Sequence, residues 1–62
     1  MYQYRSVYYF SHEEKPLASL AFNSVEQAIN HLDEMGKFKE YTGGDIEVNI
    51  PGIGWVHYQE QD

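Results

Sequence analysis

One stretch of the sequence has a clear helical period and decides the fold: residues 23–36, NSVEQAINHLDEMG. Ser24 is a favourable N-cap, and Gln27 follows three residues later, which is the spacing of a capping box. Apolar residues recur at steps of three and four and form one stripe: Val25, Ala28, Ile29, Leu32 and Met35. Gly36 is expected just beyond the end of the helix, where glycine is common. The sequence therefore predicts one helix with one apolar side.

The opposite side of this helix is polar, and it carries Glu26, Asn30, Asp33, Glu34 and Lys37. Glu26 lies in the first turn, where a carboxylate interacts favourably with the helix dipole. We place His31 on the polar side or at its margin and interpret it as a structural histidine, because polar residues prefer the surface.

The sequence on either side of the helix predicts four strands, because aromatic and β-branched residues alternate there between turn signals. The predicted strands are residues 2–10, 17–22, 45–50 and 55–59. A polar loop is expected over residues 11–16 and a turn over residues 42–45. Residues 37–41 fit an extension of the helix, a loop or a short strand. Gly52 and Ile53 suit the centre of a type II′ hairpin turn.

Connection rules give an order for these strands. The helix returns the chain along the sheet, so the third strand runs parallel to the second. Placing the third strand beside the first makes every neighbouring pair antiparallel, with a right-handed crossover. The predicted fold is α+β: a single helix packed on one face of a four-stranded antiparallel sheet, ββαββ, in the order 2-1-3-4. The length predicts a single small domain, residues 1–62.

The expected register assigns the side chains to two faces. We expect Phe10 to pair with Leu17 and Ile50 with Trp55, and alternation then decides the rest. The side expected beneath the helix carries Val7, Tyr9, Ala18, Leu20, Phe22, Ile46, Val48, Ile50, Trp55 and His57. The side expected to be uncovered carries Tyr4, Tyr8, Phe10, Leu17, Glu47, Asn49, Val56 and Tyr58, with Tyr2 near its edge.

An uncovered face with this many aromatic side chains is typical of an interaction surface. Tyrosine buries a large area, keeps a polar hydroxyl and has few torsions to immobilise. The predicted binding residues of this face are Tyr4, Tyr8, Phe10 and Tyr58. The alternative is that the tyrosines tolerate exposure and stiffen the strands through cross-strand pairs. The occupant of the face can be a foreign partner or a second copy, because small cysteine-free folds often gain stability by oligomerising.

The chain is acidic, with ten Asp and Glu residues against four Lys and Arg and a formal net charge of −6. Phosphates are bound mainly by Lys and Arg, so we expect no binding to duplex nucleic acid. The charge can serve solubility alone, or it can attract a protein with a basic surface by mimicking the charge of DNA. The second predicted binding set is acidic: Glu13, Glu14, Glu26, Asp33 and Glu34.

The sequence carries no motif for catalysis or for a cofactor. His12, His31 and His57 lie on three different predicted elements and lack the spacing of metal ligands. The glycines lack the context of a phosphate-binding loop, and no serine has that of a nucleophile elbow. A fold of this size also has little room for a ligand pocket of about 300–1,000 Å³. We therefore expect no enzyme, no metal and no cofactor.

The chain has no cysteine, which is compatible with a reducing compartment. Residues 1–5 lack the apolar core of a signal peptide, and no apolar run reaches the roughly 20 residues that a membrane span needs. We expect a cytoplasmic protein that does not bind membranes.

These features predict a small acidic protein-interaction module. A compact acidic chain without a catalytic site is typical of phage- or plasmid-encoded inhibitors that bind a host protein. The alternative is a homodimeric structural module that buries its tyrosine-rich face against itself. An aromatic strand face can also stack single-stranded bases, although the four cations are too few and too scattered for a cationic groove: Arg5, Lys15, Lys37 and Lys39.

Overall fold

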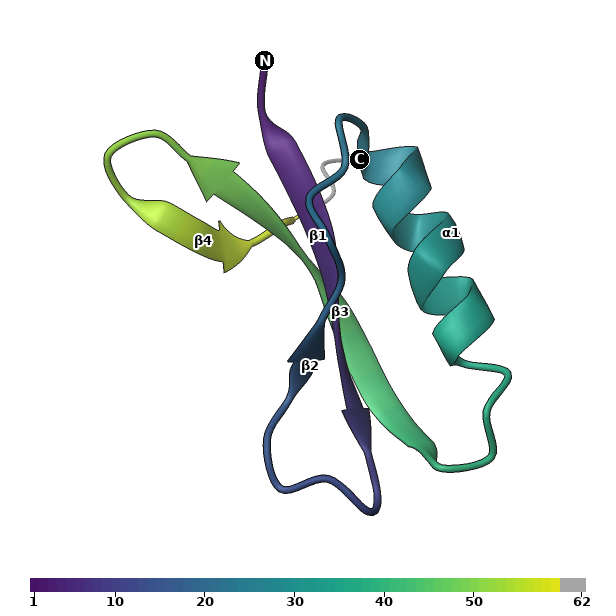
Figure 1. The fold of residues 1–62 in the computed structure, drawn as a ribbon. Helices are drawn as coiled ribbons and strands as arrows, with labels where there is room; N and C mark the ends of the chain where they lie inside the picture. The colour runs from purple at the N-terminus through teal and green to yellow at the C-terminus, as the bar shows by residue number, and fades with distance from the viewer. Residues whose placement is uncertain (60–62) are drawn as a thin grey trace.

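The computed structural model of the chain describes residues 1–59 and contains one helix and one four-stranded sheet (Figure 1). Along the chain the elements are β1 Gln3–Phe10, β2 Leu17–Ala18, α1 Val25–Met35, β3 Tyr41–Ile50 and β4 Gly54–His57. The strands lie in the order β2-β1-β3-β4, and each neighbouring pair is antiparallel. The predicted fold class and strand order are confirmed.

Helix α1 begins where its sequence predicts. Ser24 is the N-cap, and its Oγ accepts the N–H of Gln27 at 3.3 Å. The side-chain oxygen of Gln27 accepts the N–H of Asn23 rather than that of Ser24, so the capping box is displaced by one residue. Gly36 is the C-cap with φ −65°, a right-handed conformation, in place of the expected left-handed one. Residues 37–40 then form turns and a bend. Of the three alternatives for this segment, the loop is therefore the correct one, and Tyr41 begins the next strand.

Strand β3 begins at Tyr41, and the turn predicted over residues 42–45 is wrong. Gly43 and Gly44 lie within β3 and pair with β1. Helix packing explains a glycine here, because a Cβ on Gly44 would lie 2.5 Å from Cδ1 of Leu32 on α1. Gly44 therefore marks a close helix–sheet approach, and neither glycine is part of a chain reversal.

The β1–β2 hairpin is displaced from the predicted register by an even number of residues. Tyr8, rather than Phe10, pairs with Leu17. An even displacement keeps Leu17 and Ala18 on the same faces as their predicted neighbours of β1. Phe22 lies under the helix as expected, but it shares that face with Tyr4 and not with Val7. Strand β2 has only two residues instead of the predicted six-residue strand, and Leu20 beyond it is 85% exposed, so its expected place in the core is wrong.

The β3–β4 hairpin differs from the predicted register by one residue. Ile50 pairs with Gly54, not with Trp55. Gly52 has φ +83° and follows Pro51, as at the centre of a type II turn, so the expected type II′ turn is wrong. Because a shift of one residue exchanges the two faces, the whole of β4 is turned over relative to the prediction.

The helix covers the face of β1 that was expected to be open. Ser6 Oγ lies 2.6 Å from His31 Nδ1 on α1, and the rings of Tyr8 and His31 are 5.7 Å apart. Side chains alternate along a strand, so the even-numbered residues of β1 point toward the helix. We call this side the helix face: Tyr4, Ser6, Tyr8, Phe10, Ile46, Val48, Ile50, Val56 and Tyr58.

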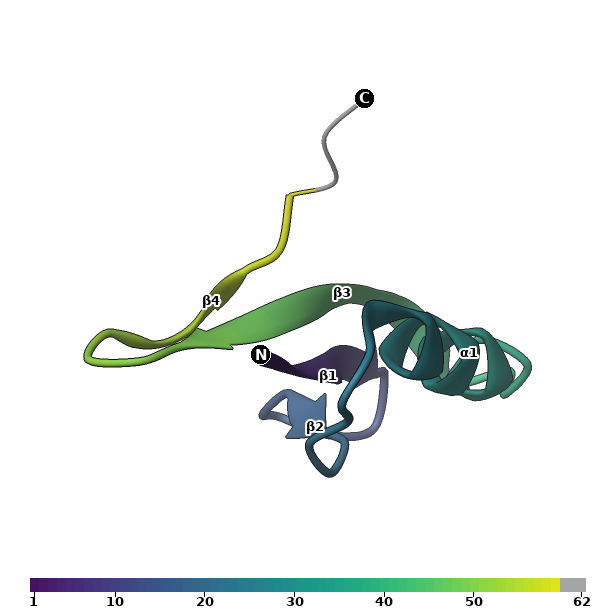
Figure 2. The same cartoon turned by 90° about the horizontal axis from the view of Figure 1, so that it is seen from above.

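The predicted helix-side positions are therefore correct for β3 but wrong for β1 and β4. Val7 and Tyr9 lie on the other side of the sheet, and so do Trp55 and His57. Helix α1 packs against β1 and β3 near the end of the sheet away from the β3–β4 turn (Figures 1 and 2). Within residues 1–59, no element packs over β4.

Candidate binding surface

The side of the sheet away from the helix is lined by alternate residues of β1, β3 and β4. We call it the open face, and its members are Arg5, Val7, Tyr9, Asp45, Glu47, Trp55 and His57. The register brings them together, because Arg5 lies opposite Glu47 on β3, and Glu47 lies opposite His57 on β4. This face combines an indole, a guanidinium, a phenol and an imidazole on neighbouring strands.

Arg5 occupies the centre of the open face. Its Nε and Nη2 atoms lie 2.9 and 2.8 Å from Oε1 of Glu47, and its Cζ lies 4.3 Å from the ring centroid of Trp55. A cation over an aromatic ring contributes about 0.5–1 kcal/mol at an exposed site. The guanidinium is thus held in one orientation between a carboxylate and an indole.

A second polar pair lies beside this group. His57 Nδ1 is 2.5 Å from Asp45 Oδ2, and Asp45 Oδ1 accepts the N–H of Ile46 at 2.9 Å. Both side chains are about half exposed, 55% for His57 and 48% for Asp45. No group of three potential metal ligands occurs within residues 1–59.

The four aromatic residues predicted to form a binding face lie on the helix face instead. Tyr8 contacts α1, and the rings of Phe10 and Phe38 are 5.8 Å apart. Tyr4 and Tyr58 pack edge to face with their centroids 5.7 Å apart. All four are half-buried, so the expectation of an uncovered tyrosine face is wrong. Their role in binding stays a prediction.

The five predicted acidic residues are all exposed, but they are divided between two elements. The β1–β2 connection carries Glu13 and Glu14, and α1 carries Glu26, Asp33 and Glu34. Glu34 pairs with Lys37 at 3.1 Å. None of the five belongs to the open face, whose acids are Asp45 and Glu47.

The predictions missed the contact between Ser6 and His31. Ser6 is fully buried, and His31 lies on the inner side of α1 between the rings of Tyr8 and Phe22. Residues in a helix follow one another by about 100°, so His31 and Ile29 lie on opposite margins of the apolar stripe. Ile29 was counted as a core residue, although it is 39% exposed. This assignment moved the expected centre of the apolar stripe away from His31. The available sequence signal was Ser6 itself, a small polar residue in the middle of a predicted strand, which needs a hydrogen-bond partner if it is buried.

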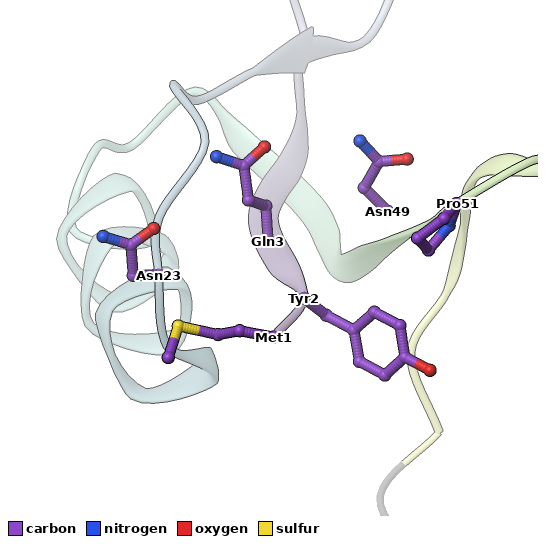
Figure 3. Close-up of a pocket in the computed structure, with 6 residues that line it drawn as sticks. All are labelled: Met1, Tyr2, Gln3, Asn23, Asn49 and Pro51. Atoms are coloured by element: carbon purple, nitrogen blue, oxygen red, sulfur yellow. The ribbon is translucent and has the colours of Figure 1, made fainter.

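Two hollows occur in the described part of the chain, and Gln3 and Asn49 of the first lie on the same side of the sheet as Arg5 and Trp55. One of about 430 Å³ is near the start of β1 (Figure 3) and is lined by Met1, Tyr2, Gln3, Asn23, Asn49 and Pro51. Asn23 and Asn49 lie on either side of Gln3 in this hollow. The other, about 350 Å³, is lined by Glu34, Met35, Lys37 and Phe38 at the end of α1.

The fold and the open face together define a class of protein: a small α+β chain in which, within residues 1–59, the helix covers one side of the sheet and the other side presents mixed aromatic and charged residues. No family model, curated protein or solved structure matches the chain significantly. In the described part of the chain, the helix is too short and too polar to span a membrane.

Proposed function

We propose that this protein is a binding module that recognises another protein through its open face. The supporting observation is that this face carries Trp55 in contact with Arg5, and Tyr9 further along β1 on the same side. Tryptophan, arginine and tyrosine are the residues that most often dominate the binding energy of protein interfaces. Tyr9 is 47% exposed, and Trp55 and Arg5 are half-buried, so each has surface left for a partner.

The side chains at the centre of the open face are already ordered. Arg5 is held by Glu47 and Trp55, and Val7 beside it is only 9% exposed. Immobilising a flexible side chain on binding costs about 0.5–1.5 kcal/mol, so a preformed arrangement loses less. This rigidity supports recognition of a partner without rearrangement of the sheet.

The charges of the open face suit a polar interface. Arg5 and Glu47 form one pair, and His57 and Asp45 form the other. Exposed ion pairs add little stability, but they set the orientation and specificity of a complex. The partner surface that fits this face has an apolar contact for Trp55 surrounded by hydrogen-bonding groups.

The exposed acids support an additional property of the same module. The net charge of −6 and the five exposed acids on α1 and the β1–β2 connection favour a partner with a basic surface. The inhibitory role and the cytoplasmic location that the sequence suggests stay predictions attached to this proposal.

The test is affinity capture from a lysate of the producing cells, followed by titration of the captured protein. Trp55→Ala removes the aromatic anchor and is expected to weaken binding by about 30-fold or more, as at an interface hot spot. Leu20→Ala is the matched control, because Leu20 is an exposed apolar residue outside the open face. Equal affinity of wild type and the Trp55 variant would overturn the proposal.

A further inference from the structure

Strand β4 forms one edge of the sheet, and no strand of residues 1–59 lies beyond it (Figure 1). The N–H of Tyr58 donates to the carbonyl of Ile46 on β3 at 2.9 Å. In an antiparallel ladder, residues that bond to the neighbouring strand alternate with residues that do not. The backbone groups of Val56 therefore point toward β3, and those of Trp55 and His57 point outward from the edge.

The opposite edge of the sheet is protected. Strand β2 has only two residues, and beyond it Ser19 Oγ accepts the N–H of Ser6 at 2.9 Å. Short strands, lysine, proline and bulges are the usual devices that prevent an edge from pairing. Strand β4 has no lysine, proline or bulge in Gly54–His57. The two edges thus differ, and β4 is the one that can accept another strand.

We infer that two copies of this chain pair through β4, antiparallel, about a two-fold axis at Val56. Trp55 of one copy then lies opposite His57 of the other copy. By symmetry, His57 of the first copy lies opposite Trp55 of the second. Each of these pairs exchanges an N–H···O=C bond in both directions, so four backbone hydrogen bonds form. The two outward-pointing residues stand on either side of Val56, which makes the edge complementary to itself.

The distribution of charge allows two acidic chains to meet at this edge. Of the nearby acids, Glu47 forms an ion pair with Arg5, and the Asp45 carboxylate is hydrogen-bonded to the His57 ring. The other exposed acids lie on α1 and the β1–β2 connection, and α1 is on the far side of the molecule from β4 (Figure 1). The copies still repel each other at long range through their net charges, and salt screens this repulsion.

Pairing at β4 continues the sheet from one copy into the other. Side chains of the two copies that share a face then lie on one surface, so the joined sheet carries two sets of Trp55 and Arg5. The inference stands on the backbone alone and does not require the open face to bind a foreign protein.

Sedimentation equilibrium of the full chain tests this inference. A small interface is typically weak, so we expect a monomer–dimer equilibrium with a midpoint between about 10 μM and 1 mM, strengthened by added salt. His57→Pro removes an outward N–H without removing a bond to β3, and proline is tolerated at such an edge position. We expect the midpoint of this variant to lie at a concentration at least tenfold above that of the wild type.

His57→Ala is the matched control, because it removes the imidazole but keeps the N–H, and it should dimerise like the wild type. A wild type that stays monomeric at about 1 mM overturns the inference. Loss of dimerisation in both variants also overturns it, since the side chain would then be responsible.

Amide hydrogen exchange of the wild type gives a measurement that needs no variant. We expect the amides of Trp55 and His57 to become protected as concentration rises through the dimer midpoint. The Val56 amide, which points toward β3, should be protected throughout. A dimer whose Trp55 and His57 amides exchange freely would place the interface on another surface and overturn the inference.

Discussion

At the scale of single residues, the absence of one side chain decides how closely the helix approaches the sheet. A Cβ on Gly44 would lie 2.5 Å from Leu32 Cδ1 and 2.9 Å from the carbonyl oxygen of Val7, and that carbonyl belongs to the backbone of β1. We expect Gly44→Ala to lower the free energy of unfolding by about 1–3 kcal/mol, the usual cost of overpacking. Urea-induced unfolding measures this loss.

Gly43→Ala is the control for this prediction. Gly43 is the neighbouring residue of β3, and no atom lies within 4 Å of a Cβ placed on it. Replacing a glycine where alanine fits reduces the entropy of the unfolded chain and stabilises by about 0.4–1 kcal/mol. Similar losses at the two positions would contradict the role assigned to Gly44.

At the scale of elements, the helix could be predicted in detail because its signals are local. Ser24 and the apolar stripe lie within a few turns of one another, and each acts through contacts inside the segment. The strand order could also be predicted, because the rules for connecting strands and helices apply to most folds. The faces could not be predicted, because pairing registers depend on contacts between distant segments. In β1, the adjacent residues Tyr8 and Tyr9 point to opposite faces of the sheet. Because both are tyrosines, the sequence there does not indicate which face is buried.

The faces of β4 were mispredicted for the same physical reason. Pairing Ile50 with Gly54 instead of Trp55 exchanges the faces of β4, which moves Trp55 out of the expected core and into the open face beside Arg5. The turn that causes this shift needs a positive φ at Gly52, and two different hairpin turns can supply one there. The exposed acids, by contrast, were predictable, because exposure of charged residues does not depend on register.

The N-cap residue Ser24 stabilises the first turn of α1. Ser24 Oγ satisfies the N–H of Gln27, which has no partner inside the helix. We expect Ser24→Ala to lower the free energy of unfolding by about 1 kcal/mol. Ser24→Asp should retain wild-type stability, because aspartate caps as well and its charge suits the helix N-terminus. Equal urea midpoints for the alanine variant and the wild type would contradict this role.

At the scale of the whole molecule, acidity opposes both folding and self-association. The net charge of −6 is distributed over a chain with few buried residues, so self-repulsion acts on a small core. Salt screens this repulsion, and we expect the Tm to rise between about 10 mM and 0.5 M sodium chloride. Measurements at about 5 μM protein keep the chain below the expected dimer midpoint, so the change reports folding alone.

A pair of charge variants isolates the electrostatic part of this salt effect. Glu13 and Glu14 are exposed on the β1–β2 connection, and changing both to glutamine takes the net charge from −6 to −4. We expect a higher Tm at low salt and a smaller rise with salt, because less repulsion remains to be screened. Changing both to aspartate keeps the charge and should keep the wild-type salt slope. Equal slopes in both variants would show that repulsion among these acids does not limit stability.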